Sequence, residues 1–275
     1  MPDYSCAMFD EKQPTNAMCI PTRHPAMMGA VPTFEPYYRR DLANVHHLGF
    51  GFHADRCASG ILALLEPVLA TNGLVLELGC GSGLLTRRLL DVGHRVIATD
   101  ASPAMLELAR DVAQGAEEIR RLTLPNDPIP ECDAIVSVGH VLSYLPDEAS
   151  IDRALVAAAG ALRPRGVFAI DLCDLRWGEV FRDAPNQGRA GDTWAIISTF
   201  SLPRPNLFVR EMISFVRAED GTWRRDEERH ENVLIDTTRV PALLAEHGLE
   251  TRVSGSFGDE ELPEGLVTIL GCRPG

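Results

Sequence analysis

Val75-Leu76-Glu77-Leu78-Gly79-Cys80-Gly81-Ser82-Gly83 is the stretch of this 275-residue chain that decides the fold. The apolar run 74–78 is typical of a buried strand, and it leads directly into three glycines at alternate positions and then into residues 84–90, which have the pattern of a helix. Glycine allows a tight turn and has no Cβ to block a ligand, and the first N–H groups of a helix have no partner within it. The stretch therefore predicts a flat backbone surface, free of side chains, at the carboxyl edge of a sheet.

Apolar strands and helices alternate on both sides of this turn. A helix is predicted upstream at 55–69; strands are predicted downstream at 96–99, 133–138 and 167–172, and helices at 103–112 and 151–162. Ser102 and Pro103 are suited to the N-cap and the first position of the second of these helices. Uniformly apolar strands that alternate with helices are typical of a parallel sheet covered on both faces.

The pattern changes after about residue 175. Mixed polar and apolar segments at 193–202, 207–217 and 222–235 predict long antiparallel strands, and Glu219-Asp220-Gly221 marks a hairpin. A helix at 240–246 and two final strands, the last at 266–271, complete the chain. We predict an α/β fold: a doubly wound, Rossmann-like, mostly parallel seven-stranded sheet with an antiparallel β insertion or lid.

Four parts of the chain are predicted from these patterns. They are a flexible N-terminal leader at 1–36, which holds six prolines and five of the seven methionines; cover helices and a cofactor-binding core at 37–175; an antiparallel insertion at 176–239, serving as lid or dimer element; and a C-terminal helix with the final strands at 240–275.

Charge and composition exclude several kinds of protein. The net charge of −13 disfavours a nucleic-acid partner, and Lys12 is the only lysine, so the folded body has no catalytic lysine. Seven widely spaced cysteines without a C-x-x-C predict free thiols and no metal site. No apolar run is long enough to span a membrane and the N-terminus lacks the features of a secretory signal. We therefore expect a cytoplasmic monomer or homodimer.

The acid at position 77 separates two classes of glycine-rich turn. In the dinucleotide fingerprint G-x-G-x-x-G the third glycine would fall where Leu84 stands, and an acid two positions before the first glycine is not usual. The chain here resembles the class I S-adenosylmethionine-dependent methyltransferases, whose first motif is acid-x-G-x-G-x-G, and the resemblance covers residues 37–272. It implies S-adenosyl-L-methionine as cofactor, S-adenosyl-L-homocysteine as product, and cofactor contacts from this motif: Glu77, Gly79, Cys80, Gly81 and Gly83.

Two further places bear on cofactor binding. Asp100 ends the second strand, where a carboxylate can accept hydrogen bonds from both ribose hydroxyls, and the resemblance gives Ala101 and Met105 contacts with the adenosyl group. Many family members have an acid after the third strand. That position falls near Leu122-Thr123, which is not acidic, so Thr123 or backbone groups are expected to contact the adenine.

The fourth strand ends in Ser137-Val138-Gly139-His140, which is expected to lie below the sulfonium and to face the acceptor. It is not the Asn/Asp-Pro-Pro-aromatic sequence of family members that methylate planar amide or adenine nitrogens, so those acceptors are disfavoured. The segment 228–231 with the helix after it resembles the inserted β-unit of a small-molecule subgroup. Val138 and Gly139 are assigned to the cofactor.

His140 is the leading candidate for a general base, because it stands at the edge of a central strand and histidine titrates near neutrality; the alternative is a histidine that orders a loop. Weaker candidates for the base are His47, His53 and His230. Residues assigned to the acceptor are Tyr37, Tyr38, His46, Phe50, Asp171 and Trp177. For these the alternatives are a packed cover helix, a loop cap at Asp171 and a core position at Trp177.

The sequence therefore predicts transfer of a methyl group to an oxygen or nitrogen, with carbon as a third option, of a small-molecule metabolite. Two alternatives are an NAD(P)-dependent oxidoreductase on a Rossmann-like sheet and a non-catalytic protein that binds S-adenosylmethionine. RNA or DNA methylation is disfavoured by the charge.

Overall fold

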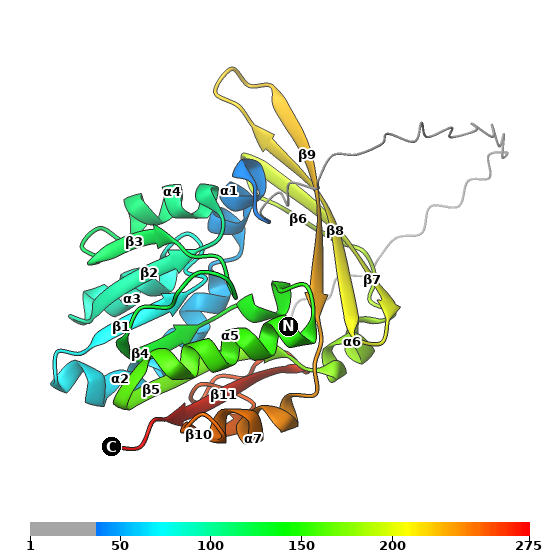
Figure 1. The fold of residues 1–275 in the computed structure, drawn as a ribbon. Helices are drawn as coiled ribbons and strands as arrows, with labels where there is room; N and C mark the ends of the chain where they lie inside the picture. The colour runs from blue at the N-terminus through cyan, green and yellow to red at the C-terminus, as the bar shows by residue number, and fades with distance from the viewer. Residues whose placement is uncertain (1–36) are drawn as a thin grey trace, which may run out of the picture. The chain divides into compact units, whose positions relative to one another are not determined.

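The structure is a computed structural model that describes residues 37–275, and the predicted leader at 1–36 lies outside the described residues. The described chain forms two sheets with helices around them (Figure 1). The larger sheet has seven strands in the order β10-β11-β5-β4-β1-β2-β3. Its strands are β1 Leu74–Leu78, β2 Arg95–Asp100, β3 Glu118–Arg121, β4 Cys132–Ser137, β5 Leu162–Cys173, β10 Glu250–Ser254 and β11 Leu266–Cys272.

This sheet is mostly parallel, as predicted. Strands β1 to β5 pair in parallel, and β11 runs antiparallel to both of its neighbours, β5 and β10. Carboxyl ends of parallel strands meet at one edge of a sheet, so the turns after β1, β2 and β4 lie close together. The predicted strands are confirmed; β5 begins at Leu162, five residues earlier than predicted.

Helices cover both faces of the larger sheet, and the covering follows from the alternation of side chains along each strand. Val75 packs with α2 and α3 on one face, and Leu76 packs with α5 and α7 on the other. The helices are α1 Arg40–Gly49, α2 Phe52–Ala70, α3 Leu84–Asp91, α4 Pro103–Val112, α5 Glu148–Ala161, α6 Leu175–Phe181 and α7 Val240–Ala245, with short 3₁₀ segments η1 Val141–Tyr144 and η2 Thr237–Arg239. At α4 the predicted cap is confirmed, since Ser102 Oγ accepts the N–H of Met105 at 3.2 Å.

The second sheet is antiparallel and has the order β6-β7-β8-β9. Its strands are β6 Gln187–Ala190, β7 Trp194–Arg204, β8 Leu207–Arg217 and β9 Trp223–Val233. Three of them match predicted strands; β6 and α6 were not predicted. Helix α1 packs on this sheet, where Leu42 and Val45 contact Trp194, Ile196 and Met212. The division into four parts stays a prediction, although all four strands fall within 176–239.

Five cysteines lie among the described residues, and all five are free thiols: Cys57, Cys80, Cys132, Cys173 and Cys272. Within residues 37–275 no helix is both long and apolar enough to cross a membrane.

Candidate active site

The three glycines of the turn after β1 all have positive φ, but they serve different purposes. A Cβ at Gly79 would collide with the side chain of Val141, and one at Gly83 would lie 3.2 Å from Ala109 Cα. Gly81, at φ +53°, has no heavy atom within 4 Å of an added Cβ. The outer glycines are therefore required by packing, whereas Gly81 leaves an open surface above the backbone.

Asp100 fixes this turn from the end of β2. Its Oδ2 accepts the N–H of Gly81 at 2.9 Å and its Oδ1 accepts the N–H of Ser102 at 2.8 Å. Burial raises the pKa of Asp100, and these backbone hydrogen bonds oppose the shift. A carboxylate has about four acceptor positions, so each oxygen can still accept a ribose hydroxyl. The turn is also tied to β2 by the N–H of Cys80, which donates to the Thr99 carbonyl at 2.8 Å.

Glu77 lies beneath the turn. It is 3% exposed, and its Oε2 accepts the hydroxyl of Thr86, the third residue of α3, at 2.5 Å. Burial raises the pKa of Glu77 to about 7, with the bond from Thr86 acting against it. These contacts make Glu77 a support that joins β1 to α3; its predicted contact with the cofactor stays a prediction.

The remaining residues assigned to the cofactor lie around the same edge. Met105 is buried at the start of α4, next to Ser102 and the preceding Ala101. Thr123 follows β3, and its N–H donates to Asp127 Oδ2 at 2.7 Å. Asp127, the acidic residue closest after the third strand, thus orders the loop in which it lies.

Asp171 fixes the turn after β4 in the same way. It has no exposed surface; its Oδ2 accepts the N–H of Gly139 at 2.9 Å and its Oδ1 accepts the N–H of His140 at 2.6 Å. His53 Nε2 lies 3.4 Å from Oδ2. Gly139 and His140 both have positive φ, so these bonds hold a turn that is costly for histidine. Of the two roles left open for Asp171, capping the loop has this physical basis; contact with the acceptor stays a prediction.

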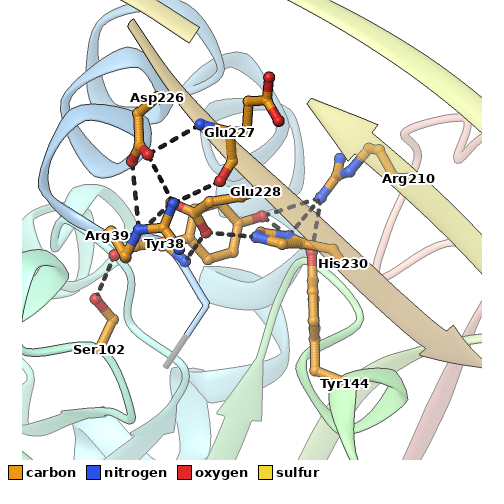
Figure 2. Close-up of polar contacts among 9 residues, drawn as sticks. All are labelled: Tyr38, Arg39, Ser102, Tyr144, Arg210, Asp226, Glu227, Glu228 and His230. Carbon is orange, nitrogen blue, oxygen red and sulfur yellow. Dashed lines mark hydrogen bonds and ion pairs between the residues drawn. The ribbon is translucent and has the colours of Figure 1, made fainter. Parts of the chain in front are cut away.

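A group of aromatic and basic side chains lies between this turn and the second sheet, and we call it the histidine–tyrosine cluster. Its members are Tyr37, Tyr38, His46, His140, Tyr144, Arg210 and His230. Tyr144 is central, because its ring stacks on His140 at 5.5 Å and its hydroxyl accepts from Arg210 Nη2 at 2.8 Å. Figure 2 shows Arg210 directed at the hydroxyls of Tyr38 and Tyr144, which are 3.0 Å apart.

Glu228 joins the cover segment before α1 to β9. Its oxygens accept the N–H groups of Tyr38 at 2.8 Å and Arg39 at 2.7 Å, and Oε2 also accepts Nε2–H of His230 at 2.8 Å (Figure 2). A carboxylate cannot donate, so His230 carries its proton on Nε2 and presents Nδ1 as an acceptor. Tyr38 is in turn held at β2, since Ser102 Oγ donates to its carbonyl at 2.7 Å.

The imidazoles of the cluster are neutral at pH 7. Burial is the main cause that lowers the pKa of His140 and of His230 to about 4 and that of His46 to about 3. The Nδ1 atoms of His140 and His46 are buried without a hydrogen-bond partner. The cluster therefore holds neutral imidazole nitrogens that can still take part in a hydrogen bond. These imidazoles lie close enough to the Arg210 cation for it to lower the pKa of all three.

The structure brings only part of the predicted site together. His140, His230, His46, Tyr37 and Tyr38 lie in the histidine–tyrosine cluster. The others lie beside it: His47 Nδ1 is 3.0 Å from Ser82 Oγ at the glycine turn; Phe50 stacks on His46 at 5.9 Å; and Trp177 packs on Phe181 at 4.4 Å, with His140 at 6.0 Å. Their roles stay predictions.

Sequence reasoning missed Tyr144 and Arg210. A signal for Arg210 was present, because the hairpin at Glu219-Asp220-Gly221 sets the register that places Arg210 opposite His230. For Tyr144 no comparable signal exists, since η1 is a single turn without periodicity.

Comparison with known proteins supports the cofactor side of this site. Residues 75–166 match the family model of a methyltransferase domain. A Geobacillus protein named as a methyltransferase is 24% identical over 192 residues, which are 68% of this chain and 78% of that protein. These matches favour neither the oxidoreductase nor the non-catalytic alternative.

Two solved structures share the fold over most of the chain. An S-adenosylmethionine-dependent methyltransferase from Clostridium acetobutylicum has a TM-score of 0.69 at 19% identity, over 85% of this chain and 98% of the other. A sugar N-methyltransferase from Streptoalloteichus also has a TM-score of 0.69, at 18% identity, over 91% of this chain and the whole of the other.

Proposed function

We propose that this chain, a class I S-adenosylmethionine-dependent methyltransferase, methylates an amine nitrogen of a small-molecule acceptor. The observation that carries the proposal is the set of buried, neutral imidazoles around Arg210, next to the turn after β4. The fold shared with a sugar N-methyltransferase agrees with a small acceptor, and the −13 charge agrees with one that is not a nucleic acid.

The residues present fit the cofactor. Gly81 leaves bare backbone, and Asp100 retains acceptor positions for ribose hydroxyls. When bound there, S-adenosylmethionine supplies a methyl group that its sulfonium activates. The protein then has to hold the acceptor in line, and such positioning contributes on the order of 7–11 kcal/mol.

Basicity favours nitrogen over oxygen. A hydroxyl acceptor has to lose its proton, and with a pKa of about 4 the imidazole of His140 is too weak a base to take one from a phenol, whose ordinary pKa is about 10. An amine acceptor needs only to be neutral, and the ordinary pKa of its ammonium form is near 10.4. Burial raises the pKa of a hydroxyl but lowers that of an amine, by up to about 3–5 units, and a neighbouring cation such as Arg210 lowers the amine's pKa further. The cluster therefore favours a neutral amine with a free lone pair.

Three groups of the chain have defined parts in this reaction. Asp171 holds the His140 backbone, so that the ring stays against Tyr144. His140 Nδ1 accepts a hydrogen bond from the neutral acceptor nitrogen and so directs its lone pair at the methyl group; the methylated nitrogen loses its proton to solvent after the transfer. Glu228 keeps His230 in the tautomer whose Nδ1 accepts a hydrogen bond.

The proposal is tested with S-adenosylmethionine labelled with ¹³C in the transferred methyl group and a small-molecule extract. We expect new methyl signals at ¹³C shifts of N-methyl groups, and none with Asp100→Ala, which lacks the ribose ligand. Label found only in O-methyl or C-methyl groups would contradict the choice of nitrogen. The absence of any labelled product would contradict the small-molecule acceptor.

A further inference from the structure

Arg210 has more hydrogen-bond donors than partners. A guanidinium carries five N–H groups, and the bonds of Arg210 all involve Nη2, which lies 2.8 Å from Tyr144 Oη, 3.3 Å from Tyr38 Oη and 3.5 Å from His230 Nδ1. Among the described residues its Nε is buried and has no partner, and none of its bonds there involves Nη1. Three N–H groups, on two sides of the guanidinium, are thus unused.

Among residues 37–275 the charge of Arg210 is also unpaired, unlike that of two exposed arginines in the same sheet. Arg224 pairs with Asp41 at 2.6 Å and Arg229 with Glu211 at 3.0 Å, whereas no carboxylate lies within 4.0 Å of Arg210 among residues 37–275. Glu228, on the far side of His230, already accepts three N–H groups. A partly buried cation without an anion is costly, and such charges are normally paired.

We infer that the methyl acceptor carries an oxyanion, either a carboxylate or a phosphate ester, which binds the free N–H groups of Arg210. The inference rests on the proposed function, and it narrows the substrate class to molecules that hold both an amine and an anionic group. Hydrogen bonds from a guanidinium to an anionic oxygen are charge-assisted and strong. The nitrogen on the same edge as Nε–H is Nη2, which already bonds the cluster, so the oxyanion accepts from Nε–H on one side or from the N–H groups of Nη1 on the other.

The tyrosine hydroxyls complete the oxyanion site. Tyr38 and Tyr144 have two hydroxyl protons between them, and their mutual bond uses one; the other remains for the ligand. Tyr144 also relates this site to the base, because its hydroxyl meets Arg210 while its ring stacks on His140. The amine and the oxyanion of the acceptor are therefore separated by about the length of one tyrosine side chain, as in a compact amino acid or amino sugar phosphate.

The first test fractionates the extract before labelling. We expect the ¹³C-methyl products to arise from the fraction that a quaternary-ammonium anion exchanger retains at about pH 11.5, where the acceptor amine is neutral and only the oxyanion is charged. Amidation of carboxylates beforehand, or treatment with phosphatase, shows which oxyanion is required. Products from the unretained fraction alone would overturn the inference and leave the methyltransferase proposal intact; no product in any fraction would count against the proposed function itself.

The second test changes the arginine. For the labelled acceptor fraction, Arg210→Gln should lower kcat/KM by about 10- to 150-fold, the loss expected for a charged hydrogen-bond partner, mainly through KM. Arg210→Lys, which keeps the charge but not the fixed planar set of donors, should recover part of the loss. Arg229→Gln, an exposed arginine on β9, is the matched control and should retain wild-type kinetics.

One competing role is tested in the same set. The methionine carboxylate of the cofactor is also an oxyanion. Calorimetry with S-adenosylhomocysteine should give Arg210→Gln the wild-type affinity. Loss of S-adenosylhomocysteine binding with unchanged KM for the acceptor would assign Arg210 to the cofactor and overturn the inference. Thermal melting of each variant shows that it is folded.

Discussion

Replacing Gly81 with alanine separates backbone strain from cofactor binding. At φ +53°, alanine has a cost of about 1–2 kcal/mol. Within residues 37–275 nothing else opposes the change, because no heavy atom of this part of the chain lies within 4 Å of the new Cβ. At about 2–4 °C for each kcal/mol in a chain of this size, we expect Gly81→Ala to fold with a melting temperature lowered by only a few degrees.

Gly93 provides a matched control. It lies in the turn before β2, at the opposite edge of the sheet from Asp100. It also has positive φ, at +96°, and no heavy atom within 4 Å of an added Cβ. Gly93→Ala therefore introduces similar strain away from the proposed site.

The two variants are compared by calorimetry with S-adenosylhomocysteine. In Gly81→Ala the added methyl group occupies the surface proposed for the cofactor, so we expect binding to weaken at least about tenfold, which is roughly 1.4 kcal/mol. Gly93→Ala should bind like the wild type. Equal affinity of all three proteins would refute the assignment of this turn to the cofactor, and equal weakening in both variants would show that strain alone is responsible.

Three further predictions concern the carboxylates and the base. Because burial raises the pKa of Glu77 from 4.5 to about 7, the folded protein binds a proton that the unfolded chain releases between these values; the free energy of unfolding should fall by about 3 kcal/mol from pH 4.5 to pH 7. Urea titrations at several pH values should show that the free energy of unfolding of Glu77→Gln does not fall in this way. A pH dependence equal to that of the wild type would contradict the prediction. His140→Ala should lower turnover about tenfold or more without changing affinity for S-adenosylhomocysteine; wild-type turnover would remove His140 from the reaction. Glu228→Gln should speed amide hydrogen exchange at Tyr38 and Arg39 by about tenfold, the effect of a loss of roughly 1.4 kcal/mol, and unchanged protection would show that other contacts hold this segment.

The fold was predictable where burial imposes a pattern. The strands of the larger sheet are covered on both faces, so they are uniformly apolar and bounded by turn residues. Strand β6 was missed because all four of its residues, Gln187–Ala190, are exposed, and an exposed edge strand needs no apolar alternation. The helix expected to reach residue 162 ends at Ala161, and Leu162 begins β5 at once.

The two parts of the candidate site differ in how far apart their residues lie in the sequence. The part assigned to the cofactor consists of two short stretches, Glu77–Gly83 and Asp100–Met105, whose shape follows from glycine and from a single cap. The part proposed for the acceptor is assembled from four separate elements: the cover segment, η1, β8 and β9. Such side chains meet only through tertiary packing, which no local pattern encodes.

Three carboxylates around the site share one role, which is to order a loop; Asp171 and Glu228 are buried and Asp100 is half-buried. Asp100, Asp171 and Glu228 each accept two backbone N–H groups, from the glycine turn and the start of α4, from the turn after β4, and from the cover segment. An acidic side chain near a histidine normally raises its pKa. At His140 burial is the largest effect and Arg210 acts in the same direction, so that together they outweigh Asp171 and lower the pKa of His140 to about 4. The carboxylates thus order the loops without neutralising Arg210 or protonating the imidazoles, which leaves the cation and the weak bases available to the acceptor that we propose.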